Sequence, residues 1–187
     1  MHQLTGSPLV LVQAGVSYDL LKQHLAAGDF QKADNETRAK LIQLAGKDAQ
    51  KRGWVYFSEV QFIAVSDLQI LDNLWRAASG GLFGYAVQKE VWQQNRRYWT
   101  PFFKAISWVQ GERNNYRKWP GEFIYSLEAP RGHLPLTNAL RGTQLFQAIM
   151  EHPAFAQEDK IKTSYSNGSN GKDSSSGNSA SNLADLF

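Results

Sequence analysis

The 187-residue sequence contains no cysteine. This excludes disulfides, iron–sulfur clusters, cysteine-ligated zinc and thiol catalysis. No apolar run approaches the roughly 20 residues that a membrane-spanning helix requires. The apolar run from Pro8 to Val12 is too short for a signal peptide and lacks its basic flank. The N-terminus also lacks a Ser/Arg-rich transit peptide, so we expect any such peptide to be absent from this sequence.

The sequence also has little excess of basic over acidic residues, since the formal net charge is only +3. The residues before Ala156 hold 17 basic and 13 acidic side chains, a net of +4. This mild excess suits an anionic ligand and is compatible with peripheral membrane association. It falls short of the clustered charge that nucleic-acid binding requires, so we expect no nucleic-acid partner.

Catalytic and metal-binding motifs are missing as well. The sequence has no HExxH, GxSxG, Walker A or GxGxxG pattern, and its four histidines lack metal-ligand spacing. His133, which directly precedes a predicted helix, is more simply a hydrogen-bonded structural residue than a ligand. We therefore predict neither an enzyme nor a metal site.

Helical periodicity is what the sequence does contain, and it predicts an all-α fold with one domain over 17–155. Helices are expected around Tyr18–Leu25, from Phe30 after an Asp29 cap to Leu44, after a Ser66–Gln69 capping box, over Tyr85–Gln94, after a Thr100-Pro101 start, and over Pro135–Met150. Residues 1–16 are expected to be irregular. Residues 156–187 are Ser/Asn/Gly-rich and expected to be disordered, although they include the apolar residues Leu183, Leu186 and Phe187.

Two aperiodic segments rich in aromatic residues interrupt the helices. Residues 47–65 are less regular, and within them Gly53–Phe57 is expected to be a loop or half-turn that presents rings rather than a short strand. Residues 109–132 combine rings with Arg, Gly and Pro. A connection this long in a compact domain is usually functional or disordered, and its aromatic content argues against disorder. Flat apolar walls beside arginines suit a porphyrin, whose large apolar face carries carboxylates at one edge. A peptide groove or a single-strand stacking platform would fit the same pattern.

Several ordered strings are more specific than these patterns. They are Asp29-Phe30-Gln31-Lys32-Ala33-Asp34 with Thr37-Arg38, Asp67-Leu68 with Leu71-Asp72-Asn73-Leu74-Trp75, Phe83-Gly84-Tyr85-Ala86-Val87-Gln88, and Gly132-His133-Leu134-Pro135-Leu136 with Leu140-Arg141-Gly142. Together they closely resemble the genomes-uncoupled-four family of oxygenic phototrophs. The resemblance covers about residues 17–155. It implies an all-helical "cupped hand", a single compact domain whose long aromatic-bearing loops form a porphyrin pocket.

The resemblance also implies a function. It is that of a non-enzymatic, monomeric regulator that binds protoporphyrin IX and Mg-protoporphyrin IX and activates magnesium chelatase in chlorophyll biosynthesis. The partner is expected to be the large porphyrin-binding chelatase subunit. The missing N-terminal bundle of cyanobacterial members and the Ser-rich tail resemble the plant and algal branch. This implies the chloroplast, in the stroma or peripherally on a membrane, and a role in tetrapyrrole signalling.

The resemblance assigns porphyrin-binding roles to six positions. The aromatic walls are expected to be Phe57, Trp119 and Phe123, with polar contacts from Asn138, Arg141 and Arg38. One departure is Gln144, which stands where some bacterial members carry a second basic residue. The alternative reading is a protein-interaction module whose aromatic groove binds a peptide.

Overall fold

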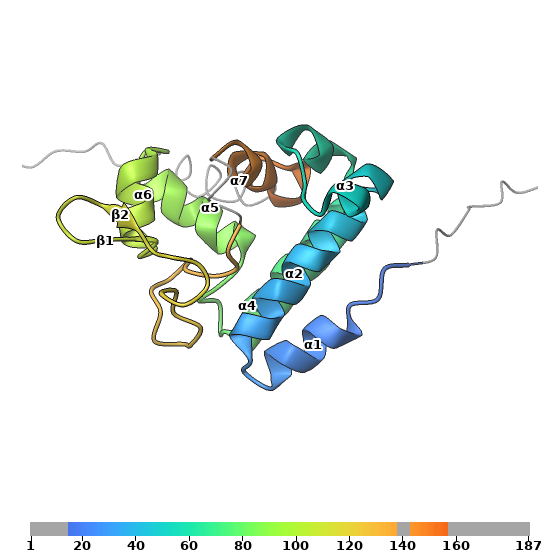
Figure 1. The fold of residues 1–187 in the computed structure, drawn as a ribbon, viewed down its shortest axis with the longest axis horizontal. Coiled ribbons are helices and arrows are strands. Elements are labelled where there is room, and N and C mark those ends of the chain that lie inside the picture. The colour runs from blue at the N-terminus through green and yellow to red at the C-terminus, as the bar shows by residue number, and fades with distance from the viewer. Residues whose placement is uncertain (1–14, 138–142, 157–187) are drawn as a thin grey trace, which may run out of the picture.

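The structure is a computed structural model that describes residues 15–137 and 143–156. Its elements in chain order are α1 (Asp19–Ala26), α2 (Phe30–Leu44), α3 (Lys47–Arg52), the 3-10 helix η1 (Phe57–Phe62), α4 (Val65–Ala78), α5 (Tyr85–Gln94), α6 (Trp99–Ala105), strands β1 (Val109–Gln110) and β2 (Asn115–Tyr116), α7 (Thr143–Met150) and the 3-10 helix η3 (Pro153–Phe155) (Figure 1). The predicted all-α class is confirmed. One short antiparallel hairpin, β1–β2, lies within the segment that was predicted to be aperiodic.

Helices α1, α2 and α4 pack against one another on one side of the molecule (Figure 1). Between α2 and α4, the Trp75 Nε1 donates a 2.9 Å hydrogen bond to Thr37 Oγ1, and the Phe30 ring stacks on Trp75. The Tyr18 hydroxyl, at the start of α1, donates to the Asp67 carboxylate at 2.7 Å. Buried aromatic packing fixed by these directional bonds gives α2 a rigid base.

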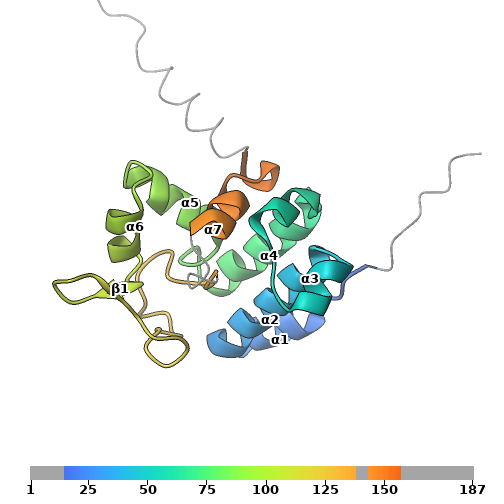
Figure 2. The same cartoon turned by 45° about the horizontal axis from the view of Figure 1, so that its top comes forward.

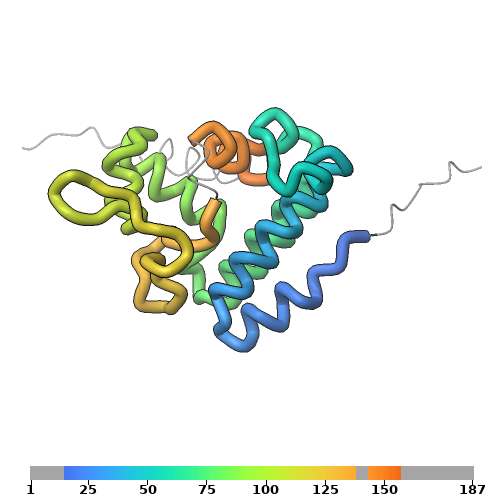
Figure 3. The backbone as a smooth tube through the Cα atoms, viewed as in Figure 1, coloured from blue at the N-terminus to red at the C-terminus, as the bar shows by residue number. Residues whose placement is uncertain are grey.

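Helices α5, α6 and α7 enclose a second aromatic cluster. Trp99 stacks on both Trp92 and Phe103, and Trp108 stacks on Phe146 of α7 with ring centroids 5.2 Å apart. Figure 2 shows α7 between α5 on one side and α4 on the other, and α7 contacts both α5 and η1. The hairpin lies beside α6, away from α1, α2 and α4 (Figure 3).

Local sequence signals explain the elements that were predicted correctly. The Asp29 carboxylate accepts a hydrogen bond from Lys32 N at 3.1 Å and caps α2, as expected. Helix α5 has the predicted bounds and begins after Gly84, whose φ of 135° is accessible to few other residues. Its first turn is capped from a distance, because Asp72 Oδ1 accepts from Ala86 N at 2.9 Å.

Two predicted helix starts are wrong. Helix α4 begins at Val65, so Ser66 lies inside it rather than capping it, and Asp67 binds Tyr18 instead. Helix α6 begins at Trp99 rather than after Thr100. Pro101 is tolerated there because first-turn amides have no partner within the helix.

Two longer segments also differ from expectation. Residues 47–65 contain α3 and η1, and only residues 53–56 between them form the loop that was expected to present rings. Residues 135–137 are not helical, because Gln88 Nε2 donates to the carbonyls of Gly132 and Pro135, and Leu136 N donates to Asp34 at 2.6 Å. These tertiary bonds replace the helical pairing that the sequence favoured.

The predicted segments 1–16 and 156–187 fall outside the described residues except for residues 15, 16 and 156. Among the described helices, none combines the length and the apolar character needed to cross a bilayer.

Candidate functional site

The loop that carries Trp119 and Phe123 is held by its own polar groups. The Arg117 guanidinium donates to the carbonyls of Ser107 and Glu122, both at 2.8 Å, and the Glu122 carboxylate accepts from Lys118 N at 2.8 Å. The loop therefore has a defined shape despite its lack of periodicity, and Arg117 contributes to that shape rather than to a ligand.

His133 anchors the far end of this loop. Its buried ring contacts the Ile106 carbonyl through Nδ1 at 2.6 Å and accepts from Ile124 N through Nε2 at 3.0 Å. This pairing requires the neutral tautomer with the proton on Nδ1. Burial lowers the pKa of His133 and so favours that form. His133 is the structural histidine that the sequence favoured.

The charge beside the exposed ring comes from α2. The Arg38 guanidinium lies 4.8 Å from the centre of the Trp119 ring and 3.4 Å from the Asp34 carboxylate. Trp119 is 45% exposed, whereas Trp75, Trp92 and Trp108 are buried. Two predicted site residues, Arg38 and Trp119, are thus brought together from positions 81 residues apart.

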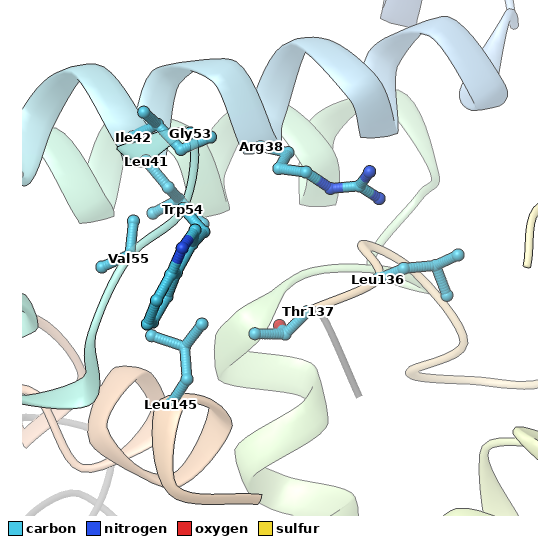
Figure 4. Close-up of a pocket in the computed structure, with 9 residues that line it drawn as sticks. All are labelled: Arg38, Leu41, Ile42, Gly53, Trp54, Val55, Leu136, Thr137 and Leu145. Atoms are coloured by element: carbon cyan, nitrogen blue, oxygen red, sulfur yellow. The ribbon is translucent and has the colours of Figure 1, made fainter. Parts of the chain in front are cut away.

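A small pocket of about 40 Å³ lies next to Arg38, between α2, the start of the 53–56 segment, residues 136–137 and α7 (Figure 4). Figure 4 shows the Trp54 ring between α2 and Leu145, with Thr137 across from it. The Arg52 guanidinium lies 4.6 Å from the centre of the Trp54 ring and holds that wall. The pocket is lined by Arg38, Leu41, Ile42, Gly53, Trp54, Val55, Leu136, Thr137 and Leu145.

Unpartnered polar atoms distinguish this pocket from an apolar packing defect. Within the described residues, Arg38 Nε is buried without a hydrogen-bond partner, and Arg38 lines the pocket. The buried hydroxyls of Thr137 and Tyr85 lie close to each other, and neither makes a hydrogen bond of ordinary geometry to a described residue. Buried polar atoms normally have partners, so such donors point to a missing one. Behind them, burial raises the pKa of Asp34 to about 7, opposed by the hydrogen bond from Leu136 N and by Arg38.

The pocket continues into a second, larger hollow of about 330 Å³ along Trp54, Val55 and Leu145. This hollow adds Tyr56, Phe57 and Gln144 to the wall. Phe57 is 49% exposed there. We call the two hollows together the cleft. The size of the larger hollow and the mostly apolar wall are typical of a site for an organic ligand.

The six predicted site residues are distributed unevenly around this cleft. Arg38 lines it, Trp119 contacts Arg38, and Phe57 lies at its other end. Phe123 packs inward against Trp108 and His133 instead. Asn138 and Arg141 lie outside the described residues.

The site residues predicted from the sequence include Phe57 but not the neighbouring Trp54, and they also omit Leu145 and Thr137. The signal for Trp54 was its place in an aromatic run. Thr137 carried no signal, because it was assigned to a helix.

Chemically, the cleft can hold a flat apolar molecule between aromatic and aliphatic walls and can donate hydrogen bonds to an anionic arm. Among the described residues, no group of three or more His, Asp or Glu is arranged to hold a metal ion. Fold and site therefore define a helical binding domain with an aromatic cleft.

A protein-family model described as GUN4-like matches residues 12–153, so the chain belongs to the GUN4 family, as its sequence strings predicted. Its structure is similar to that of GUN4 from Chlamydomonas reinhardtii, with 64% identity and a TM-score of 0.72 over 76% of this chain and 92% of that one. It is also similar to ligand-free Arabidopsis thaliana GUN4, with 48% identity and a TM-score of 0.69 over 75% and 99%.

Two curated relatives match over a similar region. The chloroplastic tetrapyrrole-binding protein of Arabidopsis thaliana is 48% identical over 76% of this chain and 56% of its own length. The Ycf53-like protein of a Synechocystis species is 39% identical over 76% and 60%. The matched region thus spans little more than half of either relative.

Proposed function

We propose that this chain binds protoporphyrin IX and Mg-protoporphyrin IX in the cleft between α2, the Trp54–Phe57 segment and α7. The observation that carries the proposal is an apolar, ring-lined pocket with two buried donors, Arg38 Nε and Thr137 Oγ1, that have no hydrogen bond of ordinary geometry to a described residue. A tetrapyrrole supplies both complements, a flat apolar face and carboxylate oxygens. The name of the Arabidopsis relative supports the same ligand class.

The residues divide into two roles in this proposal. Trp54, Leu145 and Trp119 cover the faces of the macrocycle, and Arg38 and Thr137 meet a propionate. Phe57, Asn138 and Arg141 remain predicted contributors. Phe123 then supports the loop from inside rather than covering the ligand, because its ring already packs on Trp108.

We further propose that the loaded protein acts as a regulator and not as a catalyst. Free porphyrins aggregate in water, so a carrier that covers one face can present substrate to magnesium chelatase or remove its product. The proposed partner is the large porphyrin-binding chelatase subunit. The proposed location is the chloroplast, as the name of the Arabidopsis relative indicates for that protein. Peripheral membrane association and a role in tetrapyrrole signalling remain predictions.

A porphyrin titration tests binding directly. Addition of the protein to deuteroporphyrin should shift the visible absorbance, and Trp54→Ala should weaken the affinity by about 1–3 kcal/mol through lost ring burial. Tyr98→Ala is the matched control, because this aromatic residue is 66% exposed and lines neither hollow. No absorbance shift at micromolar protein would end the proposal and favour the peptide-groove alternative.

Chelatase activation needs its own measurement. Purified chelatase subunits should form Mg-porphyrin faster when the wild-type chain is added, and less so with the Trp54→Ala variant. An equal gain with both proteins would separate activation from porphyrin binding and refute the link between them.

A further inference from the structure

A third hollow lies outside the cleft, on the far side of Phe57. It is an open groove of about 410 Å³ between η1 and α7, and we call it the η1–α7 groove. One wall is formed by Phe57, Ser58, Val60 and Gln61, and the other by Ala148, Glu151, His152 and Pro153. Grooves of this kind between helices accept apolar side chains from a short segment.

The surface beside this groove is unusually apolar. Phe62, also on η1, is 75% exposed, and Phe57 is 49% exposed. Isolated exposed rings are ordinary, but two on one short helix at the edge of a groove mark an interaction surface.

The chain itself supplies a fitting occupant. Pro153 forms part of the groove wall, and the described chain ends three residues later at Ala156. The following 31 residues are mostly polar, but Leu183, Leu186 and Phe187 gather within five positions. Their spacing of three and four is the one that places side chains on a single face of a helix.

Chain length permits the contact. Leu183 lies 27 positions after Ala156, and a flexible Ser/Gly-rich linker of that length has a root-mean-square span of about 30 Å. Because the groove lies next to the point where this linker begins, the effective concentration of the tethered segment at the groove is about a millimolar. Even weak burial of two or three apolar side chains is then sufficient for docking.

We propose that residues 183–187 dock in the η1–α7 groove, with Leu186 and Phe187 packed beside Phe57 and Ala148. Phe57 lines both this groove and the cleft. Docking therefore places the chain's own segment against a ring that also faces the ligand site. If the proposed porphyrin function holds, the docked segment restrains that ring and lowers porphyrin affinity.

The absence of cysteine makes a cross-linking test clean. The full chain is prepared with Gln61→Cys and Ala184→Cys, and disulfide formation in a glutathione buffer is followed by gel mobility. The bond requires Cα atoms within about 7 Å. The matched control pairs Ala184→Cys with Lys22→Cys, an exposed position on α1. Docking predicts that the groove pair forms several times faster than the control, and that Leu186→Asp abolishes the difference.

Equal rates for the two pairs would overturn docking, as would a fast groove pair that survives both Leu186→Asp and Phe187→Asp. Neither substitution changes a residue of the described hydrophobic core, and a thermal melt of each variant checks that the fold is kept. In the cysteine-free chain, Leu186→Asp should raise deuteroporphyrin affinity several-fold. Unchanged affinity would overturn the coupling through Phe57, whereas no porphyrin binding by wild type would overturn the proposed function and leave the cross-linking result intact.

Discussion

Trp119→Ala should weaken porphyrin binding without unfolding the domain. Trp119 is 45% exposed, and because a Trp side chain presents up to about 250 Å², roughly 110 Å² of it is open to a ligand. A flat ligand covers one face, about half of that area. At ~25 cal/mol per Å² the covered area contributes about 1.4 kcal/mol. The dissociation constant should therefore rise about tenfold.

Folding stability should change less than binding. In the free protein Trp119 makes one notable contact, the Arg38 guanidinium over its ring, and an exposed contact of this kind contributes about 0.5–1 kcal/mol. Urea denaturation measures this change, and a visible-absorbance titration with deuteroporphyrin measures the affinity. Tyr98→Ala is the matched control, because Tyr98 is 66% exposed and lies at the start of α6, outside both hollows.

Two results would refute the reasoning about Trp119. An unchanged dissociation constant would mean that the exposed ring does not meet the ligand. A loss of stability as large as the loss of affinity would mean that Trp119 acts through the fold of its loop.

Two further predictions concern the framework of the site. Gly84→Ala should destabilise the fold by about 3 kcal/mol, because the φ of Gly84 is 135° and an added Cβ would lie 2.7 Å from Asp72 Oδ1, the cap of α5. The control Gly80→Ala should destabilise it by only about 1 kcal/mol, because Gly80 has a φ of 60° and no atom lies within 4 Å of the added Cβ. Equal losses of stability in thermal melts would contradict this difference. Asp34 has its pKa raised to about 7 by burial, so the native state holds its proton more tightly than the unfolded chain does. Its contribution to stability should therefore fall as pH rises from about 4 to 7. Urea denaturation across this range should show that fall in wild type but not in Asp34→Asn, and parallel curves would refute it.

The parts of the fold that were predicted correctly are those with local causes. Helix α2 follows from an Asp29 cap and a single buried face, and α5 follows from Gly84 and its periodic apolar residues. These signals lie within one or two turns of the elements they specify. The start of the last helix could not be predicted in the same way. Pro135 and Leu136, which the sequence assigned to this helix, instead pair with side chains of α2 and α5 that lie far away in sequence.

The candidate site shows the same division. Aromatic and basic segments indicated where a flat ligand would bind, because residue types alone carry that signal. Which arginine lies at the candidate site depends on the tertiary structure. Arg117 binds the carbonyls of Ser107 and Glu122, and Arg131 pairs with Glu90, whereas Arg38 contacts Trp119 from α2.

One turn of α2 positions both sides of the cleft. Asp34 accepts from Leu136 N and so fixes the extended segment that presents Thr137, while Arg38, four residues later, reaches the Trp119 ring. The two side chains also contact each other at 3.4 Å. A change in the charge of Asp34 therefore acts on the polar wall and on the aromatic wall through one pair of neighbours. Because the pKa of Asp34 is about 7, the shape of the cleft should be most sensitive to pH near neutrality.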